Sequence, residues 1–274
     1  MEQDILLFND ITGYGKVSLS AMIPILSAYG NHVYNIPTAV VSNPLEYDSH
    51  HITDTSKHLK ITLDVWKSLD FHFENIATGF INSKEEMNII NNFISEEKPA
   101  FVMVDPIMAD NGELYDGMTS DIIELNRSLI SKSDICVPNL TEACLLADLP
   151  YNPAKFTLPF YEKICTILSS LGARDIIITG SYMDEKACNI IFNASTKTLQ
   201  PVFYDYIPKS FVGTGDVFSS IIIGEILAGK NILAATSFAS GFISQIAKYN
   251  SALTDTRNLY FEKYLNLILD RIYN

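Results

Sequence analysis

Short apolar runs alternate with amphipathic segments along most of the chain. The runs that suit buried or half-buried strands lie at residues 4–8, 32–41, 75–80, 100–104, 134–137 and 174–179. The segments with helical spacing lie at residues 19–29, 57–69, 83–94, 119–130, 141–147 and 158–171. Strands that alternate with helices of this length predict a mostly parallel sheet covered by helices on both faces.

The last third of the chain follows a different pattern. Residues 187–193 and 199–204 predict an antiparallel pair added at one edge of the sheet. Helices are expected directly after residue 213, at 233–247 and at 259–272. The polar stretch 42–55 is expected to form a loop or flap. Because no linker or repeat interrupts the pattern, we expect a single α/β domain over residues 1–274.

Composition narrows the class of protein. The 274 residues are 47% hydrophobic and 19% charged, enough for a full core. The four cysteines form no CxxC pair, which indicates buried thiols in a reducing compartment. The N-terminus has no basic, apolar leader and no run is long enough to span a bilayer, so a cytoplasmic protein is expected. A net charge of −13 without a basic stripe argues against nucleic-acid partners.

The Gly-Thr-Gly-Asp segment at 213–216 carries the first candidate chemistry. Two glycines around a threonine, followed by a long apolar run, predict a tight turn into a helix N-terminus. The free amides and the dipole of such a terminus bind anions. A carboxylate base at Asp216 beside this cradle suits phosphoryl transfer to a hydroxyl group. The alternative is an ordinary helix start with Asp216 as a first-turn acid.

Polar residues at strand ends form a second group of candidates. Asp105, Asn139 and Thr179 lie at or just past three predicted strand ends, where open α/β sheets bind ligands. Asp105, Asp110 and Glu142 could hold Mg²⁺ largely through water. Alternatively, residues 110–112 are only a turn, and Asn139 is only a helix cap with Glu142 as its capping-box acid.

Two apparent nucleotide motifs fail on context. Residues 9–18 contain a G-x-G-x-x-S run, but no acidic residue ends a second strand where a ribose would bind, so a dinucleotide fold is not expected. Residues 224–230 have the spacing of a P-loop, but Asn231 replaces the required hydroxyl residue and the run lies inside an apolar helix.

Four short motifs together resemble the ribokinase-like kinases of small hydroxymethyl compounds. They are Gly-Thr-Gly-Asp at 213–216, Asp-Pro-Ile-Met at 105–108, Asn-x-x-Glu at 139–142 and Ile-Thr-Gly-Ser at 178–181. The segments 9–15 and 139–146 look closest to the pyridoxal/pyridoxamine kinase branch. The resemblance covers essentially the whole chain. It implies a three-layer α/β/α fold and ATP-dependent phosphorylation of the 5′-hydroxymethyl group of a vitamin B6 vitamer.

The same resemblance implies roles for individual residues. Asp216 is the expected base, with an anion hole formed by Gly213, Thr214 and Gly215. The expected metal residues are Asp105, Asp110 and Glu142. The residues expected along the nucleotide are Asn139, Thr179, Ser181 and Val212. The residues expected along the substrate, together with Asp216, are Asp10, Asn43 and Tyr47. The 32–41 edge and the flap could meet a second subunit, so a homodimer is expected.

Two departures from the family pattern bear on the substrate. Pro44 and Leu45 stand in the flap where a His-Thr pair is usual, and Ala109 stands where glycine is common. Leucine cannot hydrogen-bond a pyridine substituent, and proline stiffens the flap. A hydroxymethylpyrimidine kinase or another small-molecule kinase of the same fold therefore remains an alternative, as does a vitamer-binding protein without turnover.

Overall fold

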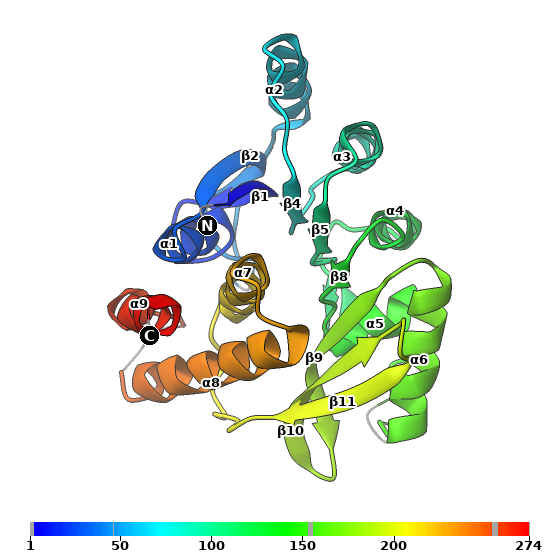
Figure 1. Cartoon of the computed structure of the whole chain (residues 1–274), viewed down its shortest axis with the longest axis vertical. Coiled ribbons are helices and arrows are strands. Elements are labelled where there is room, and N and C mark those ends of the chain that lie inside the picture. Colours follow the sequence, from blue (N-terminus) through cyan, green and yellow to red (C-terminus); the bar gives the residue numbers. More distant parts are fainter. Residues whose placement is uncertain (1–2, 46, 153–155, 254–256, 274) are drawn as a thin grey trace. The chain divides into compact units, whose positions relative to one another are not determined.

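A computed structural model describes residues 3–45, 47–152, 156–253 and 257–273, and the chain divides into two compact units. Unit 1 consists of Met1–Phe73 and Asp205–Asn274, so both ends of the chain contribute to it. Unit 2 is the intervening segment, Glu74–Tyr204. Each unit contains strands and helices (Figure 1). Among the described residues, no helix combines the length and the apolar character needed to span a bilayer.

In unit 2, strands of the main sheet follow the order β11-β10-β9-β8-β5-β4, and β6 (Ala109–Asp110) and β7 (Glu113–Leu114) form a separate two-stranded sheet. The parallel neighbours are β4 (Asn75–Thr78), β5 (Phe101–Val104), β8 (Ile135–Cys136) and β9 (Asp175–Met183). The antiparallel additions are β10 (Lys186–Asn193) and β11 (Thr198–Phe203). The helices are α3 (Lys84–Glu97), α4 (Asp121–Ile130), α5 (Leu140–Leu146) and α6 (Leu158–Ser170). β4 and most of β5 are buried, and β5 has the continuous apolar sequence expected of a strand covered on both faces.

Unit 1 is built on a parallel pair of strands. The strands are β1 (Asp4–Thr12), its parallel partner β2 (His32–Val41) and β3 (Ile52–Asp54), which pairs antiparallel with β2. The helices are α1 (Leu19–Ala28), α2 (Ser56–Ser68), α7 (Thr214–Leu227), α8 (Ile232–Ser251) and α9 (Leu265–Tyr273), with a 3-10 turn η2 (Glu262–Tyr264). α7 packs on both α1 and α8 (Figure 1). Gly224 permits the α1 contact, because a methyl group there would overlap the Tyr29 ring.

The strands depart most from the sequence prediction in three places. β1 was expected to end at residue 8 but continues to Thr12, because β2 pairs with it as far as Val41 across an irregularity in the register. The expected flap loop 42–55 contains β3, whose pairing with the end of β2 supplies partners for its backbone groups. β9 does not close at residues 180–181 but runs on to Met183, paired with β10.

The terminal helix was predicted to begin at residue 259 and begins at Leu265. The intervening backbone is held by Asn250 of α8, whose side chain accepts from Tyr260 N at 3.0 Å and donates to Tyr260 O at 3.0 Å. A side chain that bonds a backbone group replaces the helical bond that the group would otherwise make. The helix predicted from the amphipathic pattern was therefore correct from residue 265 onward, but its predicted start lay too far toward the N-terminus.

Candidate active site

The turn before α7 has the conformation that its glycines predicted. Gly213 is the N-cap of α7 with φ +85°, and a Cβ at this position would lie 2.5 Å from the carbonyl oxygen of Lys16. Only glycine fits both the backbone angle and the space. At Gly215 a Cβ would meet nothing within 4 Å, so the helix N-terminus is open on that side. Open amides at a helix N-terminus form a cradle for negative charge.

Asp216 lies in the first turn of α7, half-buried, and is reached by a side chain from β1. Asn9 Nδ2 lies 3.2 Å from Asp216 Oδ1 and also 3.2 Å from the sulfur of Met22. Asn9 is 1% exposed, so its position is fixed by the packing around β1 and α1. This bond holds the Asp216 carboxylate at the mouth of the glycine turn. Asn9 was not among the predicted site residues, since in the sequence it only opens the segment that follows the strand predicted at residues 4–8.

Asp10 is buried beside Asn9 and its carboxylate is occupied by hydroxyl groups. Thr12 Oγ1 donates to Oδ2 at 2.7 Å and Ser18 Oγ donates to Oδ1 at 2.5 Å. Burial raises the pKa of Asp10, while these hydrogen bonds oppose the shift. In the structure Asp10 therefore ties β1 to the start of α1, and its role with a substrate stays a prediction.

The flap residues predicted to contact a substrate have defined local roles. Asn43 Nδ2 donates to Ser49 O at 2.9 Å, which closes the loop on itself. Tyr47 packs edge-to-face on Tyr14, with ring centroids 6.1 Å apart, and Arg257 lies 5.9 Å from the Tyr47 ring. The carbonyl of Arg257 accepts from Val212 N at 2.9 Å. The flap and the segment leading into α7 thus share one contact through Arg257. Glu46 of the flap lies outside the described residues.

The N-terminus of α5 in unit 2 is a complete capping box. Asn139 Oδ1 accepts from Glu142 N at 2.9 Å, and Glu142 Oε2 accepts from Asn139 N at 2.8 Å. Asn139 Nδ2 also donates to Ala109 O at 2.7 Å. The contacts of Asn139 and Glu142 are therefore those of a helix cap and its capping-box acid, the alternative to a nucleotide and metal role. Such a cap leaves the other first-turn amides of α5 as potential donors to a ligand.

Glu142 is a buried carboxylate whose pKa is strongly shifted. It is 2% exposed, and Oε1 accepts from Met108 N at 3.0 Å. Burial, with a further contribution from the Asp105 charge, raises the pKa of Glu142 well above its ordinary value. Asp105 itself is 9% exposed at the end of β5. A nearby cation would relieve the repulsion between these two carboxylates.

The donor set fits Mg²⁺ only in a particular way. No group of three or more potential metal-ligating side chains occurs among the residues that the structure describes. Mg²⁺ normally uses one or two carboxylates and completes its shell with water and phosphate oxygens. Asp105 and Glu142 supply that number of carboxylates, but both Glu142 oxygens also accept backbone N–H groups, from Met108 and Asn139. Asp110 is exposed and accepts from Asn111 N at 2.8 Å.

Asp110 lies on a small hairpin that the sequence analysis read only as a loop. β6 (Ala109–Asp110) and β7 (Glu113–Leu114) pair across Asn111 and Gly112, whose φ angles are +51° and +89°. Two left-handed residues form the tight turn that Asn-Gly favours. Gly112 N donates to Thr141 Oγ1 at 3.0 Å, which attaches the hairpin to α5.

Thr179 and Ser181 of β9 differ in what they offer a ligand. Thr179 pairs with Asn139 in an isolated parallel bridge, with Thr179 N donating to Pro138 O at 2.9 Å. Thr179 of β9 and the cap of α5 are therefore adjacent, and their role along a nucleotide stays a prediction. Ser181 is fully buried, and its hydroxyl donates to Ile178 O at 3.3 Å. Ser181 thus bonds within its own strand. It also lies beside the Tyr161 phenol, whose pKa burial raises and the Ser181 contact lowers in part.

The predicted residues thus gather in two sets, one in each unit. In unit 1, Asn9 contacts Asp10 and Asp216, and Arg257 contacts Tyr47 and Val212, while the Asn43 side chain bonds within the flap. In unit 2, Asp105, Asp110, Asn139, Glu142 and Thr179 surround the start of α5. The predicted common rim for residues 105, 139, 179 and 216 stays a prediction. A family model described as phosphomethylpyrimidine kinase matches residues 19–259, which include most of both sets.

The chain belongs to the phosphomethylpyrimidine kinase family. Two curated relatives show which kinases this chain is similar to. The pyridoxal kinase of Dictyostelium discoideum is 26% identical over 171 residues, covering 57% of this chain and 55% of the relative. A hydroxymethylpyrimidine/phosphomethylpyrimidine kinase of Staphylococcus aureus is 27% identical over 183 residues, covering 64% of this chain and 62% of the relative. The matches thus span less than two thirds of these relatives.

One solved member of the phosphomethylpyrimidine kinase family matches over nearly the full length. It is a candidate phosphomethylpyrimidine kinase from Bacteroides thetaiotaomicron, in a crystal form with pyridoxal. The sequences are 32% identical, the TM-score is 0.93, and the match covers 98% of this chain and 96% of that one. The ribokinase-like fold expected from the sequence is therefore confirmed.

Proposed function

We propose that this chain is an ATP-dependent kinase that phosphorylates the 5′-hydroxymethyl group of a vitamin B6 vitamer. The observation that carries the proposal is the near full-length likeness to a family member crystallised with pyridoxal. The pyridoxal kinase among the curated relatives supports the same substrate class. Phosphorylation of an alcohol group is also the chemistry that an open helix N-terminus beside a carboxylate suits.

In the proposed reaction, Asp216 accepts the proton of the substrate hydroxyl. Asn9 holds the Asp216 carboxylate at 3.2 Å, so the base is oriented before the substrate arrives. The first-turn amides of α7 receive the charge that develops on the transferred phosphoryl group. Closure of the 42–55 flap excludes water that would otherwise hydrolyse ATP.

The nucleotide role belongs to the residues at the start of α5. We propose that Asn139 and Thr179 lie along ATP, with Ser181 acting through the local backbone and Val212 lying where the α7 turn begins. Asp105 and Glu142 would hold Mg²⁺ through water, with Asp110 close by on the β6–β7 hairpin. When bound, the ion neutralises phosphate charge.

A second candidate substrate is a hydroxymethylpyrimidine. The S. aureus relative carries that activity in its name, and Pro44 and Leu45 replace polar flap residues of the pyridoxal kinase branch. Pro44 is buried against Gly15, with its Cγ 3.4 Å from the position of a Cβ there. The same position lies 3.0 Å from Asn258 Oδ1, so Pro44 and Asn258 both pack at the flap base, where Pro44 has no backbone N–H to donate to a substrate ring.

An ATP-consumption assay with Mg²⁺ and a panel of acceptors tests the proposal. The acceptors are pyridoxal, pyridoxamine, pyridoxine, hydroxymethylpyrimidine and ribose. We expect the highest kcat/KM with one of the three B6 vitamers. A clear preference for hydroxymethylpyrimidine would establish the second candidate. Vitamer binding without phosphorylated product would indicate a binding protein and would contradict the kinase proposal.

We also propose a cytoplasmic homodimer. β2 presents Tyr34 and Val40 at 42% and 47% exposure, and β3 pairs only with the end of β2. Exposed apolar side chains on a partly unpaired strand favour association with another chain. Light scattering on the purified protein should give twice the mass of the 30.6 kDa chain.

A further inference from the structure

Helix α5 is short and is held at both ends. It has seven residues, fewer than an isolated helix needs to form in water. Its N-terminus is fixed by the capping box of Asn139 and Glu142. Its last carbonyls must also find donors, because four carbonyl groups at a helix end have no partner within the helix.

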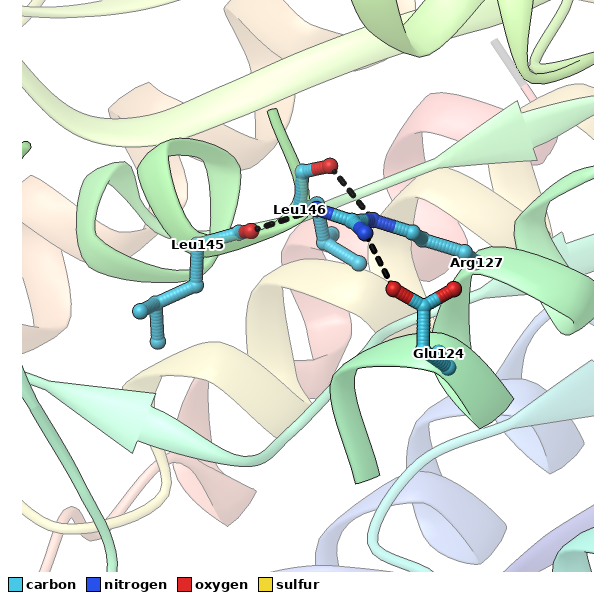
Figure 2. Close-up of polar contacts among 4 residues, drawn as sticks. All are labelled: Glu124, Arg127, Leu145 and Leu146. Carbon is cyan, nitrogen blue, oxygen red and sulfur yellow. Dashed lines mark hydrogen bonds and ion pairs between the residues drawn. The ribbon is translucent and has the colours of Figure 1, made fainter. Parts of the chain in front are cut away.

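Arg127 of α4 supplies donors at the C-terminal end. Its Nε donates to Leu146 O at 2.8 Å and its Nη2 donates to Leu145 O at 3.2 Å, while Nη1 pairs with Glu124 (Figure 2). The Arg127 side chain is 22% exposed, so the contact is largely shielded from water. A guanidinium at a helix C-terminus satisfies carbonyls and interacts favourably with the helix dipole.

Asn126, the residue before Arg127 on α4, contacts the segment that binds Glu142 at the N-terminal end of α5. Asn126 Nδ2 lies 3.3 Å from the sulfur of Met108, and Met108 N donates to Glu142 Oε1 at 3.0 Å. α4 therefore touches both the segment that binds Glu142 and the far end of the helix that carries Glu142. Movement of α5 along its axis would break contacts at both places.

We propose that Arg127 is a positioning residue for nucleotide binding. By holding the C-terminus of α5, it fixes where Asn139 and Glu142 lie relative to the β6–β7 hairpin. The proposal rests on the function proposed above, in which those residues serve ATP and Mg²⁺. It predicts that loss of the guanidinium weakens nucleotide binding while the vitamer KM is preserved, because the vitamer residues belong to the other set.

The test compares Arg127→Met with Arg174→Met as a matched control. Arg174 also lies in unit 2 and pairs with Asp134, but its side chain is 77% exposed. ADP affinity with MgCl₂ is measured by calorimetry, the KM values for ATP and pyridoxal by turnover, and amide exchange over residues 140–146 by mass spectrometry. Arg127→Lys restores the charge with a single-point donor and serves as the conservative rescue.

For Arg127→Met we expect ADP affinity to fall by up to about tenfold, the limit reached when the Leu146 carbonyl lacks its donor only in the α5 position that binds ADP. The ATP KM should rise by a similar factor, the pyridoxal KM should stay within about twofold, and α5 amides should exchange faster. Arg127→Lys should recover part of the loss. Arg174→Met should change none of these quantities.

A lower melting temperature with unchanged ADP affinity in Arg127→Met would overturn the inference, since Arg127 would then only stabilise the fold. Equal increases in both KM values would overturn it as well. If the wild-type protein binds ADP but phosphorylates no vitamer, the proposed function fails separately, and the ADP and exchange measurements still decide the role of Arg127.

Discussion

At the scale of single residues, Asp216 is the side chain on which the proposed chemistry depends most. Its carboxylate is held by Asn9 at the start of α7, beside amides that can receive negative charge. Asp216→Asn keeps the size of the side chain but removes the proton acceptor. We expect kcat to fall by about two to four powers of ten, the usual range for loss of a general base.

The measurement is turnover with the best acceptor of the panel, together with ADP binding by calorimetry. ADP binding should remain within about threefold of wild type. The change removes only the interaction of the Asp216 charge with the dipole of α7, which is worth a few tenths of a kcal/mol. Turnover near the wild-type rate would remove Asp216 from the role of base.

Gly213 gives a second prediction at this scale. Gly213→Ala places a Cβ 2.5 Å from Lys16 O at a φ of +85°, whereas at Gly215 a Cβ meets nothing within 4 Å. We expect Gly213→Ala to lower the free energy of unfolding by about 1–3 kcal/mol and Gly215→Ala to leave it nearly unchanged. Urea denaturation of both variants checks this; equal effects would mean that the turn is less constrained than its geometry indicates.

The sequence predicted the residues of the candidate site better than the contacts between them. The glycine turn was predicted because glycine suits a left-handed backbone, whereas an acid such as Asp216 is common in any first helical turn, so its role as a base stays a prediction. Asn9 and Arg257 were missed, because Asn9 contacts Asp216 across 207 positions of the chain and Arg257 makes its contacts through its ring interaction and its backbone carbonyl. Such partners depend on long-range packing, which a local pattern does not contain.

At the scale of elements, long apolar or amphipathic segments were predicted closely, and their ends were not. Helix α6 was expected at 158–171 and is Leu158–Ser170. The terminal helix was misplaced by six residues at its start, since Asn250 competes for the backbone at Tyr260. The β6–β7 hairpin was missed because strands of two residues are too short to show a period.

The docking of helix α9 yields a prediction about stability. Arg271 Nη2 and Nε each lie 2.8 Å from Glu225 Oε2, and Tyr29 OH donates to the other oxygen at 3.1 Å. Glu225 is 1% exposed, so removal of its cation leaves a buried charge. We expect Arg271→Met to lower the free energy of unfolding by about 3 kcal/mol.

The control for this prediction is Lys16→Met, which breaks an ion pair with Glu262 at 3.5 Å between two exposed side chains. That change should cost less than about 1 kcal/mol. Adding Glu225→Gln to Arg271→Met should recover stability, because the remaining group is then neutral. Similar losses in Arg271→Met and Lys16→Met would show that the Glu225 pair contributes no more than a surface contact.

At the scale of the whole molecule, the α/β class followed from the alternation of strands and helices, and the family from motifs spread over the chain. Local patterns could not indicate that the two ends of the chain meet in one unit. α1 contacts both α7 and α9, which lie about two hundred residues further along the chain. Contacts of this separation are set by packing rather than by any local period.

The single domain predicted over residues 1–274 can be tested by calorimetry. The family match at 19–259 runs through both units, so we expect one cooperative transition with equal calorimetric and van't Hoff enthalpies. The unit 1 variant Arg271→Met should then shift the entire transition, because a single cooperative transition includes both units. Two transitions, only one of which moves in Arg271→Met, would mean that the inserted segment Glu74–Tyr204 folds independently.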